Sequence, residues 1–263
     1  MTLRLETKGH VAHLLIDRLD KRNAFNMAMW EMMPGLLDQV ERNPEAKALV
    51  IRSAEAGAGS KAAGFKTPFC AGADIKELLA NKDAAQWRAA NQAAINRVQH
   101  KLARLDRPTV AFVEGDCIGG GCGLALACDL RVATGAARFG ITPAKLGLVY
   151  PLHDVKLLTD LVGPGQAKRI LYTGSLLDAA EAQRIGLIEM IAEEPTDLID
   201  ALLAASPHSI RESKKFVRRV LDGQVADDED TLRLFAEAFT GADFLEGTSA
   251  FVEKRKPSFG GHS

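Results

Sequence analysis

Two short runs of small residues in this chain of 263 residues have the composition needed to bind an oxygen atom through the backbone. They are Ala71-Gly72-Ala73-Asp74 and Gly119-Gly120-Gly121, and each lies between an apolar segment and a segment with helical character. Small residues allow close approach to the peptide N–H groups, and such groups at the start of a helix favour negative charge. If the fold joins the two runs, one N–H from each would form an oxyanion hole, which stabilises a carbonyl oxygen as it gains charge.

The triple glycine taken alone predicts only close packing of a helix against a strand. It does not match the dinucleotide fingerprint G-x-G-x-x-G, because Leu124 stands where the third glycine would be. The sequence also lacks the motifs of P-loop phosphate sites, zinc proteases and serine hydrolases. The second run of small residues, in a similar context, is the observation that favours an oxyanion hole.

The elements that must position these runs alternate between strands and helices. Continuous apolar runs predict buried strands at 48–51, 109–113 and 130–133. Two strand–turn–helix units therefore lie in tandem, at 51–79 and 110–128. This order predicts an α/β fold with right-handed crossovers.

The pattern before and after these units differs. A β-hairpin is expected within residues 3–17, and a surface loop rich in Ala, Gly, Ser and Lys is expected at 54–68. After Phe139 the pattern becomes mostly helical. We therefore expect a sheet-containing core at 1–139 and a helical extension, with a role in oligomerisation, at 140–263.

Composition limits the classes of function. The chain has 33 Lys+Arg and 34 Asp+Glu, a formal net charge of -1, which argues against a nucleic-acid partner. No apolar run approaches the roughly 20 residues of a membrane span, and the first residues lack the apolar core of a signal peptide. The four cysteines form no C-x-x-C pair, so metal or redox clips are not expected. We expect a reduced, cytoplasmic protein.

Seven motifs along the chain carry a family resemblance. They are Arg22-Asn23-Ala24-Phe25-Asn26, Phe69-Cys70-Ala71-Gly72-Ala73-Asp74-Ile75-Lys76, Gly119-Gly120-Gly121-Cys122, Cys128-Asp129-Leu130-Arg131, Phe139-Gly140, Leu146-Gly147-Leu148 and Ala250-Phe251-Val252-Glu253-Lys254-Arg255-Lys256-Pro257. In this order they resemble the crotonase superfamily, the enoyl-CoA hydratase/isomerase fold, over nearly the whole chain.

The resemblance implies a spiral of repeated ββα units followed by a carboxy-terminal helical extension. It implies that Ala73 and Gly120 donate the two N–H groups that hold the thioester oxygen of an acyl-CoA and stabilise its enolate. It implies no permanently bound cofactor, since coenzyme A is part of the substrate. The residues implied in substrate and coenzyme A binding are Ala24, Ala71, Asp74, Ile75, Lys76, Pro143 and Lys254.

Two positions depart from the hydratases of this family. Hydratases carry a glutamate shortly after the glycine pair and a second in the next loop, and the two carboxylates handle the attacking water and its proton. The corresponding residues here are Gly123 and Pro143, neither of which transfers a proton. We therefore expect slow hydration of simple 2-enoyl-CoAs.

The loop that follows is similar to the methylmalonyl-CoA decarboxylase branch of the superfamily. This similarity implies that Tyr150 lies at the reacting acyl group, so Tyr150 is the third predicted catalytic residue. That branch, however, has a histidine at the position of Ala73 and a glutamate at the position of Gly123. Asp154 is interpreted as a residue that caps the next helix or interacts with its dipole.

Three reactions therefore stay open: hydration, double-bond isomerisation and decarboxylation, all of which share a thioester enolate. A fourth alternative is a non-catalytic acyl-CoA-binding protein. Members of the family form trimers or dimers of trimers, so the resemblance implies a homo-oligomer. The same prediction is favoured by an apolar surface late in the chain that a short helical extension can hardly bury alone, formed by Phe235, Phe239, Phe244, Leu245 and Phe251.

Overall fold

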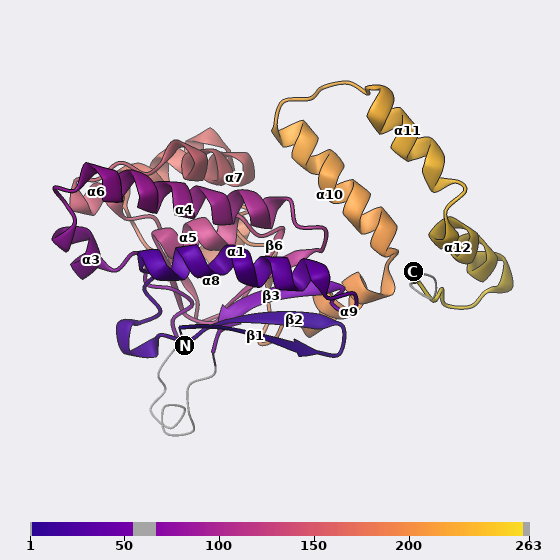
Figure 1. Cartoon of the computed structure of the whole chain (residues 1–263), viewed down its shortest axis with the longest axis horizontal. Coiled ribbons are helices and arrows are strands. Elements are labelled where there is room, and N and C mark those ends of the chain that lie inside the picture. The colour runs from indigo at the N-terminus through magenta and orange to yellow at the C-terminus, as the bar shows by residue number, and fades with distance from the viewer. Residues whose placement is uncertain (1, 55–66, 260–263) are drawn as a thin grey trace.

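The computed structural model describes residues 2–54 and 67–259 and contains two β-sheets with helices packed around them (Figure 1). The loop predicted at 54–68 lies almost entirely outside the described residues. No helix in the described part of the chain is long and apolar enough to cross a membrane.

The larger sheet has six strands in the order β1-β2-β3-β4-β6-β9. Their bounds are β1 Leu3–Lys8, β2 Val11–Ile16, β3 Ala48–Ser53, β4 Thr109–Val113, β6 Leu130–Ala133 and β9 Met190–Ile191. The first two strands form the predicted antiparallel hairpin, and every later neighbour is parallel. This confirms the α/β alternation and all three strands predicted from apolar runs.

A smaller sheet of three strands, in the order β5-β7-β8, lies apart from the first. Its strands are β5 Asp116–Ile118, β7 Arg138–Gly140 and β8 Leu177–Asp178. They have two or three residues each, too few to show an alternating pattern in the sequence. This sheet was not predicted.

Five of the described α-helices begin after a residue whose side chain accepts a hydrogen bond from one of their first N–H groups: α1, α3, α8, α10 and α11. Asn26 caps α1, because its side chain accepts a hydrogen bond from the Met29 N–H at 3.1 Å. The α-helices are α1 Met27–Arg42, α3 Ile75–Ala80, α4 Ala85–Ala103, α5 Gly120–Leu126, α6 Pro143–Leu146, α7 Leu152–Thr173, α8 Ala179–Arg184, α9 Thr196–Ala204, α10 Pro207–Leu221, α11 Glu229–Ala238 and α12 Ala242–Glu253. Helix α7 contains a break in helical geometry at Gly163.

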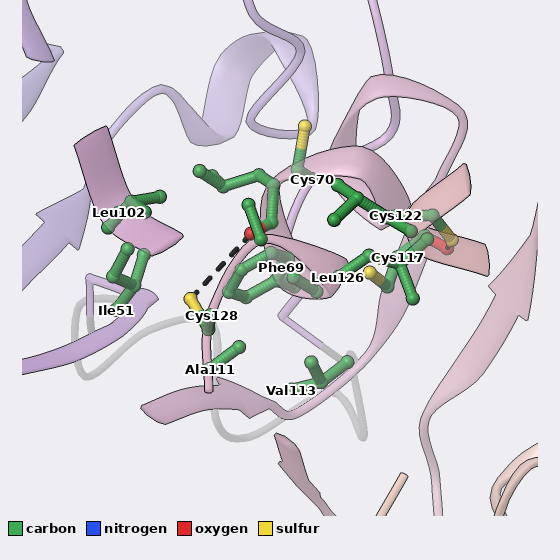
Figure 2. Packing of buried hydrophobic residues seen from close by; sticks show 14 of the residues in the cluster. Ile51, Phe69, Cys70, Leu102, Ala111, Val113, Cys117, Cys122, Leu126 and Cys128 are labelled. Carbon is green, nitrogen blue, oxygen red and sulfur yellow. Dashed lines mark hydrogen bonds between the residues drawn. The ribbon is translucent and has the colours of Figure 1, made fainter. Parts of the chain in front are cut away.

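The main hydrophobic core lies between the larger sheet and the helices α1, α4, α5 and α7. All four cysteines are buried there as free thiols, and Figure 2 shows them among Ile51, Phe69 and Leu102. The core also includes Leu158 and Leu177, so it continues past the boundary predicted at residue 139.

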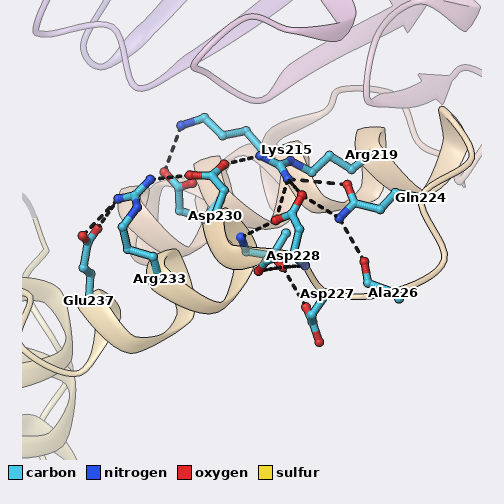
Figure 3. Close-up of polar contacts among 11 residues, drawn as sticks. Lys215, Arg219, Gln224, Ala226, Asp227, Asp228, Asp230, Arg233 and Glu237 are labelled. Carbon is cyan, nitrogen blue, oxygen red and sulfur yellow. Dashed lines mark hydrogen bonds and ion pairs between the residues drawn. The ribbon is translucent and has the colours of Figure 1, made fainter.

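Helices α10, α11 and α12 extend to one side of this core (Figure 1). Polar side chains join α10 to α11: Arg219 contacts Asp228 at 2.9 Å and pairs with Asp230 (Figure 3). These helices form the predicted carboxy-terminal helical region. Phe235, Phe239 and Phe251 on them are 64%, 52% and 85% exposed.

Candidate active site

The two runs of small residues meet because parallel neighbouring strands lead into them. Strands β3 and β4 pair in parallel, so the chain leaves both at the same edge of the sheet. Cys70 and Cys117 then form a parallel bridge: Cys70 N–H donates to Asp116 O at 3.0 Å, and Ile118 N–H donates to Cys70 O at 2.9 Å. Three residues further along each segment stand Ala73 and Gly120.

The backbone geometry at Ala73 and Gly120 is that of two adjacent free donors. A Cβ placed on Gly120 would lie 3.9 Å from Ala73 N. Phe25 bonds to Gly72 O and Asp74 N, each at 2.8 Å, so the N–H of Ala73 between them points to the opposite side. Gly120 is the first residue of α5, so its N–H has no partner within the helix. Neither N–H has a hydrogen-bond partner among the described residues.

The hollow beside Gly123, the position of the first family glutamate, is filled by three polar side chains. A Cβ on Gly123 would lie 2.4 Å from Asp154 Oδ1, 2.8 Å from Gln99 Nε2 and 3.3 Å from the Tyr150 hydroxyl. Gln99 Nε2 donates to Asp154 Oδ1 at 2.6 Å. A carboxyl group therefore occupies the space that a side chain at residue 123 would enter.

The structure corrects the interpretation of Asp154 as a helix cap. Its carboxyl does not cap α7: the N-cap is Pro151, and the helix has no side-chain cap. Asp154 does stand in the first turn, where the dipole favours an acid, but it is only 3% exposed. Burial raises its pKa, and the hydrogen bond from Gln99 offsets this only partly. A role at the helix terminus alone would not require burial of the carboxylate.

Tyr150 lies beside the glycine turn. It is buried, and its hydroxyl donates to Gly119 O at 3.1 Å, one residue from the Gly120 donor. Burial, followed by the nearby Asp154 carboxyl, raises the pKa of Tyr150 well above its ordinary value, so the phenol stays protonated at neutral pH. His153 has a different environment, since its ring stacks on His100 with centroids 4.5 Å apart.

Three of the residues predicted to bind coenzyme A lie along the backbone next to Ala73. Arg18 joins two of them, donating to Ala24 O at 2.8 Å and to Asp74 Oδ2 at 2.9 Å. Ala71 N–H donates to Arg22 O at 3.1 Å. Burial alone would raise the pKa of Asp74, but the bonds from Arg18 and from the first N–H groups of α3 lower it overall. The Asp74 carboxylate therefore acts as a structural cap of α3.

The remaining predicted residues are less closely grouped. Ile75 and Lys76 are exposed at the start of α3, next to Asp74. Pro143 is the first residue of α6. Lys254 follows α12, which lies on the side of the molecule away from α3 (Figure 1). A single chain thus does not bring Lys254 to the other residues.

Gln99 and Arg18 belong to this site and were not predicted. Gln99 does leave a signal in the sequence, since it is a polar residue beside the apolar stripe of α4 formed by Val98 and Leu102. It is 1% exposed, and its Oε1 has no hydrogen-bond partner among the described residues. Arg18 leaves no comparable signal, because its partner Asp74 is 56 residues away.

Comparison with known proteins identifies the family. The family model described as enoyl-CoA hydratase/isomerase matches residues 6–262. The chain belongs to this family.

Relatives and solved structures match along nearly their full length. A short-chain-enoyl-CoA hydratase from Clostridium acetobutylicum is 32% identical over 263 residues, which cover 96% of this chain and 95% of the relative. A crotonyl-CoA hydratase from Syntrophomonas wolfei is 32% identical, with 97% and 96% covered. The crystal structure of an enoyl-CoA hydratase from Bacillus anthracis aligns with a TM-score of 0.85 and 27% identity, covering 100% of both chains. The chain thus has the crotonase fold.

Because the two small-residue runs approach closely, we expect Gly121→Ala to destabilise the protein. A Cβ on Gly121 would lie 2.5 Å from Cys70 O and 2.7 Å from Cys70 Cβ, so the backbone must shift. We expect the free energy of unfolding to fall by about 1–3 kcal/mol, and turnover to fall with it. Gly35→Ala is the matched control, because Gly35 is also helical but has nothing within 4 Å. That variant should gain about 0.5–1 kcal/mol. Equal stabilities of the two variants in urea unfolding would contradict the close approach.

Proposed function

We propose that this member of the enoyl-CoA hydratase/isomerase family binds an acyl-CoA thioester and stabilises its enolate. The thioester oxygen would accept hydrogen bonds from the N–H groups of Ala73 and Gly120. The observation that carries this proposal is the juxtaposition of these two donors, whose N–H groups have no partner among the described residues. Donors fixed before the reaction stabilise developing charge without a cost of reorganisation.

The coenzyme A portion of the substrate would lie along the segments that flank Ala73. Ala24, Ala71, Asp74, Ile75 and Lys76 line this edge, and Pro143 would contact the acyl end. Lys254 would reach a phosphate only from a neighbouring subunit. Coenzyme A enters and leaves with the substrate, so the proposal includes no permanently bound cofactor.

The reaction proposed is proton transfer at the carbon next to the thioester, with slow hydration of simple 2-enoyl-CoAs. The relatives named above are hydratases, which supports an enoyl-CoA substrate. Gly123 and Pro143 supply no carboxylates, however, and hydration by this family's route uses two. Proton transfer at one carbon needs only one acid–base group.

Deletion of one donor tests the oxyanion hole. Gly120 is the first residue of α5, a position where proline fits a helix, so Gly120→Pro removes the N–H while the helix can still form. We expect kcat to fall by about 10²–10³-fold, with a smaller loss of acyl-CoA affinity. Gly120→Ala keeps the donor, and its Cβ would make ordinary contacts at 3.7 Å or more, so it should retain more activity. Unchanged turnover in a folded proline variant would exclude this hole.

A panel of three substrates tests the reaction. Crotonyl-CoA, a 3-enoyl-CoA and methylmalonyl-CoA report hydration, isomerisation and decarboxylation, respectively. We expect crotonyl-CoA hydration to be slower by about 10²-fold or more than in a hydratase with two carboxylates. The reference enzyme is the Clostridium acetobutylicum relative, assayed in parallel. Hydration at the reference rate would contradict this prediction, and tight binding with no turnover of any substrate would favour the non-catalytic alternative.

We also propose that the chain forms a trimer or a hexamer. Phe235, Phe239 and Phe244 form an aromatic cluster with neighbouring ring centroids 5.4 Å apart, and its outer surface is exposed. An exposed apolar surface of this kind marks an interface. Light scattering at micromolar concentration should give three or six chain masses, and Phe235→Glu with Phe239→Glu should lower the mass. A monomer mass for the unaltered chain would contradict the proposal.

A further inference from the structure

The buried polar cluster next to the glycine turn holds one acid. Asp154 is the only carboxyl group among the buried residues of the described chain. It contacts Gln99, whose Oε1 is buried without a partner in the same part of the structure. Buried polar groups are normally satisfied, so an unpaired acceptor beside a buried carboxyl is unusual for a purely structural site.

The cluster lies one helical turn from the proposed oxyanion hole. Gly120 and Gly123 are three residues apart in α5, so they face the same side of the helix about 5 Å apart along its axis. The Asp154 carboxyl packs on Gly123, and Tyr150 links this position to Gly119. In a thioester whose oxygen lies at Gly120 N–H, the α-carbon is bonded to the carbonyl carbon. The acyl group would therefore begin about one helical turn from the Asp154 carboxyl.

We propose that Asp154 exchanges a proton with the α-carbon of the bound acyl group, so that it performs the acid–base step from helix α7. The inference rests on the proposed function, since it requires an acyl-CoA thioester in the oxyanion hole. In the forward direction the α C–H bond breaks and its proton moves to an Asp154 carboxylate oxygen. The electron pair of that bond becomes part of the enolate, whose oxygen carries the charge at Ala73 and Gly120. Return of the proton to the α-carbon, or to the γ-carbon of a 3-enoyl group, restores the carboxylate.

The environment of Asp154 suits this exchange. Burial raises the pKa of the carboxyl, which makes its carboxylate a stronger base, and the Gln99 amide holds one oxygen in place. The other titratable groups nearby are Tyr150, His153 on the same helix, His100 stacked on His153, and Cys117 and Cys122, which face Tyr150. Burial raises the pKa of Tyr150 and of Cys117 and lowers the pKa of both histidines.

The test measures exchange of the α-protons of butyryl-CoA in D2O by NMR. Butyryl-CoA is saturated, so neither hydration nor isomerisation contributes. Asp154→Asn keeps the shape of the side chain and removes the base. We expect its exchange rate to fall by about 10²-fold or more, while butyryl-CoA affinity changes by less than about threefold. Asp160→Asn on the same helix is the control, since that exposed carboxylate pairs with Lys156 and should exchange as the wild type.

The pH profile separates proton transfer from a structural role. Asp154 acts as a carboxylate, so the wild-type rate should rise with pH through its raised pKa and level off above it. This rise should be absent from the residual rate of Asp154→Asn and should persist in His153→Gln. If the rise disappears in His153→Gln and persists in Asp154→Asn, the proposal is wrong.

A double variant that moves the carboxyl from residue 154 to residue 123 provides a second, independent test of the proposal. Gly123→Glu with Asp154→Gly removes the carboxyl from α7 and places one on α5 in the same space. We expect exchange at least tenfold above that of Asp154→Asn, or clear exchange if Asp154→Asn does not fold. A folded double variant without exchange, or Asp154→Asn at the wild-type rate, overturns the assignment of Asp154 and leaves the proposed function intact. Absence of both binding and exchange in the wild type would instead overturn the proposed function itself.

Discussion

The contact between two backbone segments, at Cys70 and Gly121, is the constraint on which the site depends. Cys70 O would lie 2.5 Å from any Cβ on Gly121, so the segments approach as closely as a glycine permits. The bridge between Cys70 and Cys117 fixes their register and brings Ala73 beside Gly120. Two parallel strands, a bridge and a glycine thus create a binding geometry to which no side chain contributes.

Charge is distributed unevenly around this geometry. On the coenzyme A side, Asp74 is neutralised by Arg18 and by the first N–H groups of α3, so it serves the local fold. On the acyl side, Asp154 accepts a hydrogen bond from the Gln99 amide, lies near the Tyr150 phenol, and forms no ion pair with a cation among the described residues. Burial with neutral donors leaves a carboxyl reactive, whereas an arginine partner would hold it firmly ionised.

Much of the larger sheet could be predicted from the sequence, because strands such as β4 and β6 are continuous apolar runs with clear ends. The turns that carry Ala73 and Gly120 could also be predicted, because their motifs are local. The Asp154 side chain could not be placed, because its inward position depends on α7 packing against α5. That packing joins residues about 30 positions apart, including 123 and 154, and no local pattern in the sequence predicts it. The short strands β5, β7 and β8 were missed for a related reason: their pairing, and not their composition, makes them strands.

The overlap at Gly123 also limits how a protein of this kind can change over evolutionary time. A side chain at residue 123 would place its Cβ 2.4 Å from the inward Asp154 carboxyl, so one of the two must move aside. In a lineage that carries a glutamate at 123, an acid on α7 must therefore point elsewhere until residue 123 becomes small. Sterics thus couple the two positions, which should vary as a linked pair among descendants.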